Sequence, residues 1–250
     1  KMFSFKSGMQ IYPQTIAKVM DERVITFADV TKIEKQDSMY RISYDNAGHT
    51  KHIDADIVIS TIPAYACANL IRHFDSEVGL HLDSIFYPPV MVLYLGYKKE
   101  DVKRNLDGFG FLIPEKEEKS FLGAIWSSTI FPNRSKENEV AFTLFVGGSR
   151  NKEMFSKVDK EIIINNAIDE FEKIMGINEK HIYKSYRYWS KAIPQYTIGY
   201  VEHERYFDKF EKKFPGLILS GNYRGGISVG DCIKNSELMY DKIVSTIGNA

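Results

Sequence analysis

The chain has 250 residues, enough for one large domain or two smaller ones with a substantial apolar core. Its 33 basic and 33 acidic side chains balance, so the composition lacks the basic excess of a nucleic-acid-binding protein. Two cysteines, Cys67 and Cys232, lie far apart in no metal-binding spacing. They support neither a disulfide framework nor a zinc site and fit a reducing compartment. No apolar run approaches the ~18 to 20 residues of a membrane span.

The first part of the chain predicts a helix and a small β-meander. Apolar residues recur at helical spacing over residues 9–20. Strands are expected over 24–33, 40–44 and 53–60. The Asn/Gly-rich joint between the second and the third strand is typical of a hairpin turn.

Residues 54–63 have a further feature, a nearly continuous Ile/Val run that ends in Ser60-Thr61-Ile62-Pro63. Such runs are typical of strands covered on both faces in parallel sheets. An apolar helix is expected over 64–71. We therefore predict that the chain joins an α/β layer at this point.

The middle of the chain predicts a broad sheet, antiparallel or mixed. Its strands are expected over 90–97, 110–113, 121–127 and 140–146. A further strand is expected over 182–189. An amphipathic helix over 159–175, ended by Gly176, precedes the last strand, and a helix over 203–213 follows it. We expect the α/β fold class with an α+β insertion, in which one lobe is built from both chain ends and a sheet lobe lies between them.

Residues 217–232 join a short apolar strand to a helix through a turn with four glycines. This order places free backbone N–H groups and the positive end of a helix dipole at one point, which suits an anionic or electron-rich ligand atom. Glycine also lets the main chain approach a ligand closely. An ordinary tight βα connection explains the pattern equally well, because a lone Gly-rich turn is a weak signal.

The residue patterns required for several kinds of catalytic and metal sites are absent from this sequence. No GxSxG nucleophile elbow occurs, so acyl-transfer hydrolysis is not expected. His49 and His52 flank a predicted hairpin tip, where a solvated role is expected and not metal ligation. Asp231 opens the last helix, where its carboxylate complements the helix dipole. No acid–base pair and no catalytic residue stand out, which fits a reaction carried by a redox cofactor.

Four segments follow one another in an order and spacing shared with one family. They are Gly8-Met9-Gln10, residues 55–63, residues 131–134 with 145–150, and residues 215–230. In these segments the chain resembles the flavin-dependent protoporphyrinogen and coproporphyrinogen oxidases of the flavin-containing amine oxidoreductase superfamily. The strand over 55–63 is shared across the superfamily, whereas 131–134 and 145–150 narrow the resemblance to porphyrinogen oxidases.

The resemblance implies the C-terminal portion of such an enzyme. It implies part of a FAD/NAD(P)-binding, glutathione-reductase-like domain over 1–63 and 201–250, and a mixed-sheet substrate-binding lobe over 64–200. The GxGxxG motif that holds the FAD pyrophosphate in the family is absent from the sequence, and Lys1 is not an initiator Met. We therefore expect a missing N-terminal half as a partner, without which the chain is inactive. A homodimer and membrane contact through that half stay open.

The same resemblance implies that the cofactor is FAD and points to five residues that contact it. Val30 lies in a strand at the adenine position, Trp189 lies beside the flavin ring, and Ile227, Ser228 and Val229 form the turn before the last helix. Packing in the core explains Val30 and Trp189 equally well, since a lone aromatic residue is usually structural.

Three further residues match positions that bind the substrate in the family. Ile125 and Ala141 lie on adjacent strands against the faces of the macrocycle, and Tyr196 lies near the flavin. The family usually continues its Pro-Gln-Tyr with Gly-His, whereas Gly199-Tyr200 stands here. Any role of that His therefore does not transfer.

The activity implied is oxidation of a porphyrinogen by FAD, with oxygen as the acceptor, in haem biosynthesis. The location expected is cytoplasmic, with attachment to the inner face of the membrane left open. Protoporphyrinogen and coproporphyrinogen are both open as substrates. The alternatives are an amine- or polyene-oxidising enzyme of the same superfamily and, for the chain by itself, a non-catalytic folded module with an apolar cleft.

Overall fold

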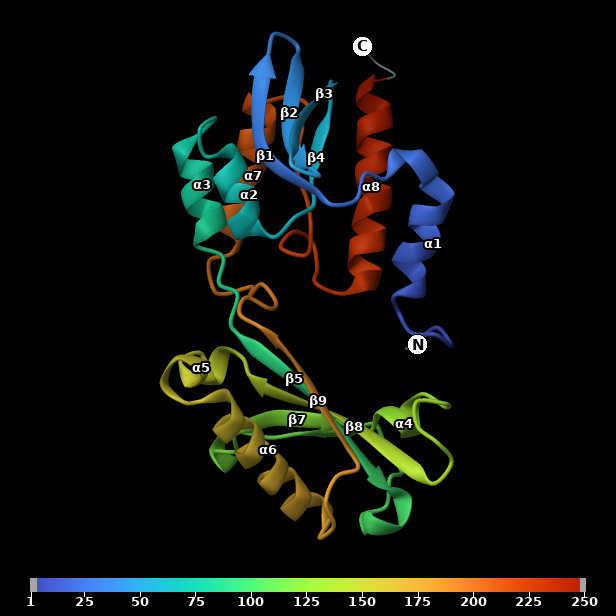
Figure 1. Cartoon of the computed structure of the whole chain (residues 1–250). Coiled ribbons are helices and arrows are strands. Elements are labelled where there is room, and N and C mark those ends of the chain that lie inside the picture. Colours follow the sequence, from blue (N-terminus) through green and yellow to red (C-terminus); the bar gives the residue numbers. More distant parts are fainter. Residues whose placement is uncertain (1–3, 248–250) are drawn as a thin grey trace. The chain divides into compact units, whose positions relative to one another are not determined.

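The computed structural model describes residues 4–247, with side chains through residue 245, and contains two compact units (Figure 1). The sheet unit consists of Lys1–Val19 and Pro88–Ala192. The α/β unit consists of Met20–Tyr87 and Ile193–Ala250. Each unit has its own apolar core, so each is described by itself.

The sheet unit is built on a five-stranded antiparallel sheet with the strand order β6-β7-β8-β5-β9. Its strands are β5 (Val90–Lys98), β6 (Gly110–Leu112), β7 (Phe121–Ile125), β8 (Glu139–Gly147) and β9 (Tyr183–Trp189). The shorter elements are α1 (Ile11–Met20), η2 (Lys99–Asp101), η3 (Glu115–Glu117), α4 (Ser127–Ile130), η4 (Ser149–Asn151) and α5 (Met154–Lys157).

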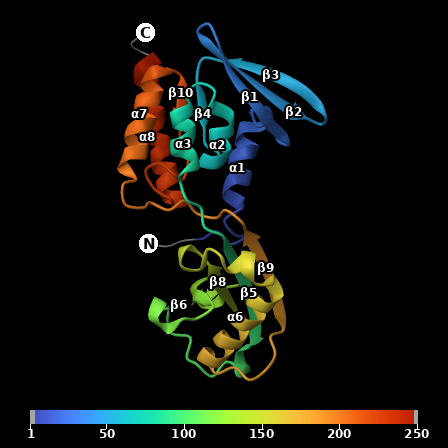
Figure 2. The ribbon, with the colours of Figure 1, turned by 90° about the vertical axis from the view of Figure 1, so that its left-hand side faces the viewer.

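One face of this sheet is closed by α6 (Lys160–Met175) (Figures 1 and 2). Because side chains alternate along a strand, Leu93 of β5 and its partner Leu144 of β8 both point to this face and are fully buried. Phe171 of α6 is buried in the same core, with its ring 5.0 Å from that of Phe142. Asp159 caps the helix by accepting from Glu161 N at 2.8 Å, and Gly176 ends it at φ +66°.

The α/β unit contains two small sheets. In the first, β1 (Ala28–Gln36), β2 (Met39–Asn46) and β3 (His49–Ala55) form an antiparallel meander. In the second, β4 (Val58–Ser60) pairs in parallel with β10 (Leu217–Leu219). Between the strands lie η1 (Asp21–Arg23), α2 (Ala64–Ile71), α3 (Ser76–Asp83) and α7 (Val201–Lys213), and α8 (Val229–Ile247) follows β10.

The parallel pair confirms that the chain joins an α/β layer near residue 58. Val58 N donates to Gly216 O at 2.7 Å, and Ser220 N donates to Ser60 O at 2.8 Å. Leu217, Leu219 and the helical residues around them are buried in one core. The fold class expected from the sequence is therefore confirmed. Among residues 4–247, no helix combines the length and the apolar composition that a bilayer crossing requires.

Two predicted strands differ from the structure, and helix α3 has no counterpart in the prediction. The strand expected over 53–60 is two strands, because the chain leaves the meander after Ala55 and enters the parallel pair at Val58. The strand expected from residue 24 begins at Ala28. Helix α3 was not predicted: it is short and polar, and it depends on Asp75, whose carboxylate accepts from the N–H groups of Glu77 and Val78.

The two units do not coincide with the ranges 1–63, 64–200 and 201–250 expected from the sequence. Helices α2 and α3 belong to the α/β unit, since they pack on β1 and α7. Residues 4 and 5 belong to the sheet unit, where Arg134 donates to Ser4 Oγ at 3.0 Å and to Phe5 O at 3.1 Å. The assignment of FAD and substrate to separate lobes stays a prediction.

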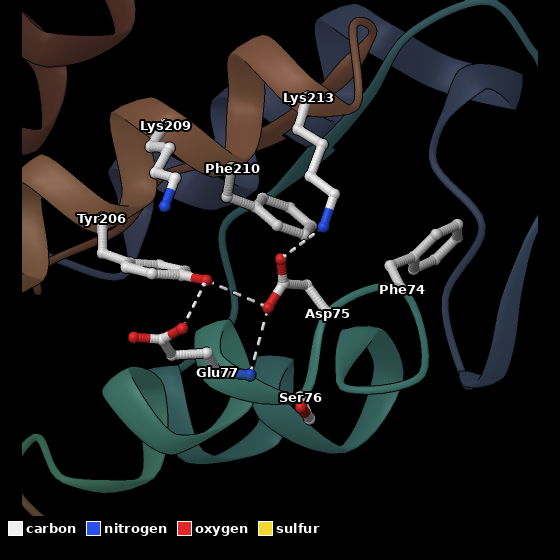
Figure 3. A pocket seen from close by; sticks show the side chains of 8 residues that line it. All are labelled: Phe74, Asp75, Ser76, Glu77, Tyr206, Lys209, Phe210 and Lys213. Atoms are coloured by element: carbon white, nitrogen blue, oxygen red, sulfur yellow. Dashed lines mark hydrogen bonds and ion pairs between the residues drawn. The ribbon is translucent and has the colours of Figure 1, made fainter.

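Aromatic rings and charges join α3 to α7 (Figure 3). Tyr206 OH donates to Asp75 at 3.1 Å and to Glu77 at 3.2 Å, and Lys213 Nζ lies 2.9 Å from Asp75. The Nδ1 atoms of His81 and His203 lie 2.9 Å apart. One imidazole of this pair must donate and the other accept, so the contact needs at least one neutral ring.

Replacing Phe171 with Ala is expected to lower the free energy of unfolding of the sheet unit by about 3–5 kcal/mol, because it leaves a cavity between α6 and the sheet. Both tryptophans, Trp126 and Trp189, lie in this unit, so urea unfolding followed by tryptophan fluorescence reports it. The matched control is Ile162→Ala on the same helix, where the side chain is 53% exposed. That control is expected to change the value by less than about 0.5 kcal/mol.

Acid is expected to weaken the α/β unit through His203. Burial and the adjacent His81 lower the pKa of His203 from its ordinary value of about 6.5. Below about pH 6.5 the unfolded chain takes up a proton that the folded chain does not, so the free energy of unfolding decreases as the pH falls below this value. Above about pH 6.5 the imidazole is neutral in both states, and the free energy of unfolding keeps its full value. Urea unfolding on both sides of the window measures the effect.

The variant His203→Asn should flatten this pH dependence, whereas His49→Asn in the exposed hairpin should retain it. Equal pH slopes in the wild type and in His203→Asn would contradict the assignment.

Candidate functional site

The Gly-rich turn lies at the carboxyl ends of the parallel strands β4 and β10. A pocket of about 310 Å³ opens there. It is lined by residues that follow the two strands and by the first turns of α8, among them Thr61, Pro63, Ser220, Asn222, Cys232 and Asn235. Ligands of open α/β sheets bind outside the carboxyl ends of the strands. We therefore take this pocket and the turn beside it as the candidate site.

A reciprocal capping box starts α8. Ser228 Oγ accepts from Asp231 N at 3.0 Å, while the Asp231 carboxylate accepts from Ser228 N at 3.2 Å and from Ser228 Oγ at 2.6 Å. These hydrogen bonds hold the pKa of Asp231 below its usual range. The structural role expected for Asp231 is confirmed, and the N–H of Ser228 is already used within the protein.

The next two N–H groups remain directed away from the helix. Val229 and Gly230 occupy the first two helical positions, where a backbone N–H has no acceptor within its own helix. No hydrogen bond from either group occurs within residues 4–247. The turn therefore offers two donors at the positive end of a 19-residue helix.

Arg224 fastens the turn to α7. Its guanidinium lies 3.0 Å from Glu204, 2.7 Å from Asp208 and 2.6 Å from Glu211, three carboxylates on one face of that helix. The side chain is 17% exposed, and it also donates to Leu219 O at 3.0 Å. From the other side, Asn235 of α8 donates to Arg224 O at 3.0 Å. Arg224 therefore fixes the turn to both helices, through its side chain to α7 and through its carbonyl to α8.

Two tyrosines hold the same turn from the segment before α7. Tyr196 OH donates to Asn222 O at 3.2 Å and accepts from Gly226 N at 3.1 Å. Tyr200 OH donates to Tyr223 O at 2.6 Å. Burial raises the pKa of both phenols. Tyr200, which stands where the family usually has His, is thus a clamp on the turn that the sequence did not reveal.

Cys67 of α2 is not a nucleophile. It is fully buried, and Ser60 Oγ donates to its sulfur at 3.1 Å. Burial raises the pKa of this thiol, so it stays neutral near pH 7.

The sheet unit carries a second set of candidate residues. We call the sheet face opposite α6 the outer face. By strand register, Ile125 pairs with Thr143, Ala141 with Gly96, and Trp189 with Val90, all on this face. An apolar pocket of about 300 Å³, lined partly by Leu112, Ile125 and Phe145, lies on it. The structure therefore places two predicted substrate residues and Trp189, which is 48% exposed, on one surface.

Val30 lies on strand β1 in the meander of the α/β unit. It pairs with Tyr44 at a β-bulge of the meander and is 38% exposed. Its proposed contact with adenine stays a prediction. Tyr196 lies at the turn with Ile227, Ser228 and Val229, and its binding of substrate likewise stays a prediction.

The arginines of the two motifs that narrowed the resemblance have structural partners. Arg134 donates to Phe5 O, and Arg150 donates to Ile113 O at 2.7 Å. Gly147 turns at φ +96°, where an added Cβ would lie 2.5 Å from the Phe155 ring. These motif positions are therefore explained by packing in the sheet unit.

Two other cavities are polar and open. One of about 490 Å³ lies between α3 and α7, but Asp75, Glu77, Tyr206 and Lys213 satisfy one another there (Figure 3). Another of about 600 Å³ is lined by charged loops near Lys99 and Glu137. Within residues 4–247, no group of three or more His, Cys, Asp and Glu side chains is placed to hold a metal ion.

The fold is that of an α/β protein, and its strand–turn–helix junction is of the kind that suits a nucleotide-type cofactor. Residues 2–237 match the family described as flavin containing amine oxidoreductase, and the chain belongs to this family. Flavin is the cofactor of the family. The residues present fit the ring and ribityl end of FAD, because the turn that borders the pocket leads to two N–H donors at the N-terminus of α8. The chain has no GxGxxG for the pyrophosphate.

Comparison with individual curated proteins shows which members of this family the chain is similar to. The chain is 31% identical to a chloroplastic protoporphyrinogen oxidase of Oryza sativa subsp. japonica, over 93% of this chain and 45% of the relative. It is 32% identical to protoporphyrinogen oxidase 2 of Arabidopsis thaliana, over 97% and 50%. It is 25% identical to coproporphyrinogen III oxidase of Bacillus subtilis (strain 168), over 92% and 48%. The chain thus spans about half the length of these relatives.

Solved structures show the same fold. A protein from Exiguobacterium sp. 255-15, provisionally assigned as a protoporphyrinogen oxidase, aligns with a TM-score of 0.78 at 20% identity, over 96% of this chain and 51% of that one. A putrescine oxidase bound to putrescine aligns with a TM-score of 0.70 at 13% identity, over 96% and 53%.

Removing the Arg224 cation is expected to destabilise the α/β unit strongly. In Arg224→Leu, three carboxylates lose their shared partner, and Glu211 is nearly buried. We expect a loss of about 3–5 kcal/mol in the free energy of unfolding. The control is Arg205→Leu, which breaks an exposed pair with Glu202 on the same helix and should cost less than about 1 kcal/mol. Urea unfolding followed by circular dichroism measures both, and similar losses would show that the network is unimportant.

Proposed function

We propose that this chain forms part of a FAD-dependent porphyrinogen oxidase of haem biosynthesis. Family membership together with the donor-bearing turn at the carboxyl ends of β4 and β10 carries the proposal. The named relatives, two protoporphyrinogen oxidases and a coproporphyrinogen III oxidase, support the substrate class. Because the chain spans about half of each relative, the pyrophosphate-binding half is proposed to come from outside these 250 residues.

When bound, FAD would supply the acceptor for hydride removed from the substrate, with oxygen as the final oxidant. The chain's own residues would bind and orient. The N–H groups of Val229 and Gly230 would donate to electron-rich atoms of the flavin, while Ser228 and Asp231 keep the helix start rigid. Arg224, Tyr196 and Tyr200 would hold the turn in place.

The outer face of the sheet would bind the macrocycle. Ile125, Ala141 and Trp189 would give it flat apolar and aromatic contacts that exclude water, which suits a large planar substrate. None of the described side chains is assigned as a general base. Cytoplasmic location, homodimer formation and membrane contact remain proposals without a structural argument.

An amine substrate is the second candidate, suggested by the fold likeness to putrescine oxidase. A similar fold at 13% sequence identity does not indicate that two proteins share a substrate. The edge strand β9 presents the cation Arg187 on the outer face, and this charge would repel a positively charged amine. This charge favours the porphyrinogen.

The test uses the enzyme assembled from this chain and a co-expressed half that carries GxGxxG. We expect a yellow complex that converts porphyrinogen into fluorescent porphyrin and produces no hydrogen peroxide from putrescine. A folded complex without flavin colour or porphyrin fluorescence would overturn the proposal, and peroxide from putrescine alone would favour the amine oxidase.

Replacing Val229 with Pro is expected to weaken FAD binding selectively. Pro is well tolerated at the first helical position but has no N–H, so the variant removes one proposed donor and keeps the helix. Loss of one hydrogen bond predicts a roughly tenfold increase in Kd. Val229→Ala keeps the N–H and should bind within about twofold of the wild type. Flavin fluorescence titration measures both, and equal affinities would remove Val229 N–H from the site.

A further inference from the structure

Arg187 is a cation on the outer face of the sheet, on the edge strand β9. On β9 it pairs with Val92 of β5, which in turn pairs with Phe145 of β8. Cross-strand partners point to the same face, so the three side chains form a row across the outer face. The Arg187 guanidinium lies 4.9 Å from the centre of the Trp189 ring, two residues along the same strand. Arg187 therefore stands beside the residues proposed to hold the macrocycle.

Its position differs from that of the other cation on this strand. Lys184 points to the opposite face, where its Nζ lies 3.6 Å from Glu161 of α6. Within residues 4–247, no ion pair or side-chain hydrogen bond accompanies Arg187, and its guanidinium lies over the Trp189 ring. A guanidinium stacked on an aromatic plate keeps its edge free for a planar, bidentate anion.

The distance across the sheet suits a ligand with an apolar body and an acidic rim. The apolar pocket at Ile125 and Phe145 lies on β7 and β8. Phe145 is separated from Arg187 by two strand spacings, about 10 Å. A planar macrocycle on Ile125, Phe145 and Val92 would carry a rim substituent to β9. A carboxylate at that rim would meet the guanidinium.

We propose that Arg187 binds a carboxylate on the rim of the tetrapyrrole and thereby orients the macrocycle on the outer face. This inference rests on the proposed function and deepens it, because it names the group that the site recognises. Loss of the charge should weaken binding of the free acid and leave binding of an ester unchanged. A simpler explanation is that Arg187 only guards the exposed edge strand against pairing with other chains. That role predicts no dependence on the ligand's carboxylates.

The experiment titrates the 250-residue chain with coproporphyrin III, which has four carboxylates, and with its tetramethyl ester. Binding is followed by quenching of tryptophan fluorescence, since Trp189 lies beside Arg187. The wild type should bind the acid more tightly than the ester. Arg187→Gln should increase the Kd for the acid about tenfold and leave the Kd for the ester within about twofold. Arg187→Lys, a point charge without the planar fork, should lie between them.

Lys184→Gln is the matched control, because it removes one positive charge from the opposite face of the same strand. It should change neither Kd, and unchanged circular dichroism should accompany every variant. Acid binding by Arg187→Gln that equals the wild type, or equal wild-type affinity for acid and ester, would overturn the role of Arg187 while leaving the proposed function standing. Failure of the folded chain to bind either ligand would overturn this inference. The activity of the assembled enzyme would then decide the proposed function separately.

Discussion

The geometry of the candidate site depends on one guanidinium surrounded by three carboxylates. Arg224 leaves the Gly-rich turn and ends among Glu204, Asp208 and Glu211 of α7. Burying charges is costly, so the network is a weak source of stability, but removing Arg224 takes the shared partner from all three carboxylates, of which Glu211 keeps Lys242 at 3.3 Å. The network holds the Gly-rich turn in one orientation relative to α7. The free N–H groups at the start of α8 keep their direction because the turn cannot rotate away from α7.

In the sheet unit, side chains alternate between the two faces of the sheet, so one face forms the core and the other is available for a ligand. Leu93 and Leu144 point to α6 and build the core, whereas Ile125 and Ala141 point to the other face. A ligand face can therefore vary without disturbing the residues that hold the sheet to its helix. The same alternation explains why aromatic side chains such as Trp189 can remain half exposed on a stable domain.

The sequence predicted local elements well and long-range relations poorly. The helix over 64–71 matches α2 because its apolar spacing is local. The change of sheet between Ala55 and Val58 could not be predicted, since both sides have β-branched residues and the new partner lies beyond residue 215. The Arg224 network and the Tyr200 clamp join residues from different elements, so no spacing reveals them. The resemblance supplied Ile125, Ala141 and Trp189, but the strand register showed that they share a face.

The order of the strands has a consequence for how the protein is made. The α/β unit cannot complete its parallel pair until β10 has been synthesised. Likewise, Tyr40 cannot donate its hydrogen bond to Pro215 O until that residue, 175 positions later in the sequence, has been added. The sheet unit, by contrast, is one continuous stretch apart from its N-terminal segment. Local contacts form faster than distant ones. Emergence from the ribosome would therefore complete the sheet unit first, while the strands and helices before residue 88 wait for the end of the chain.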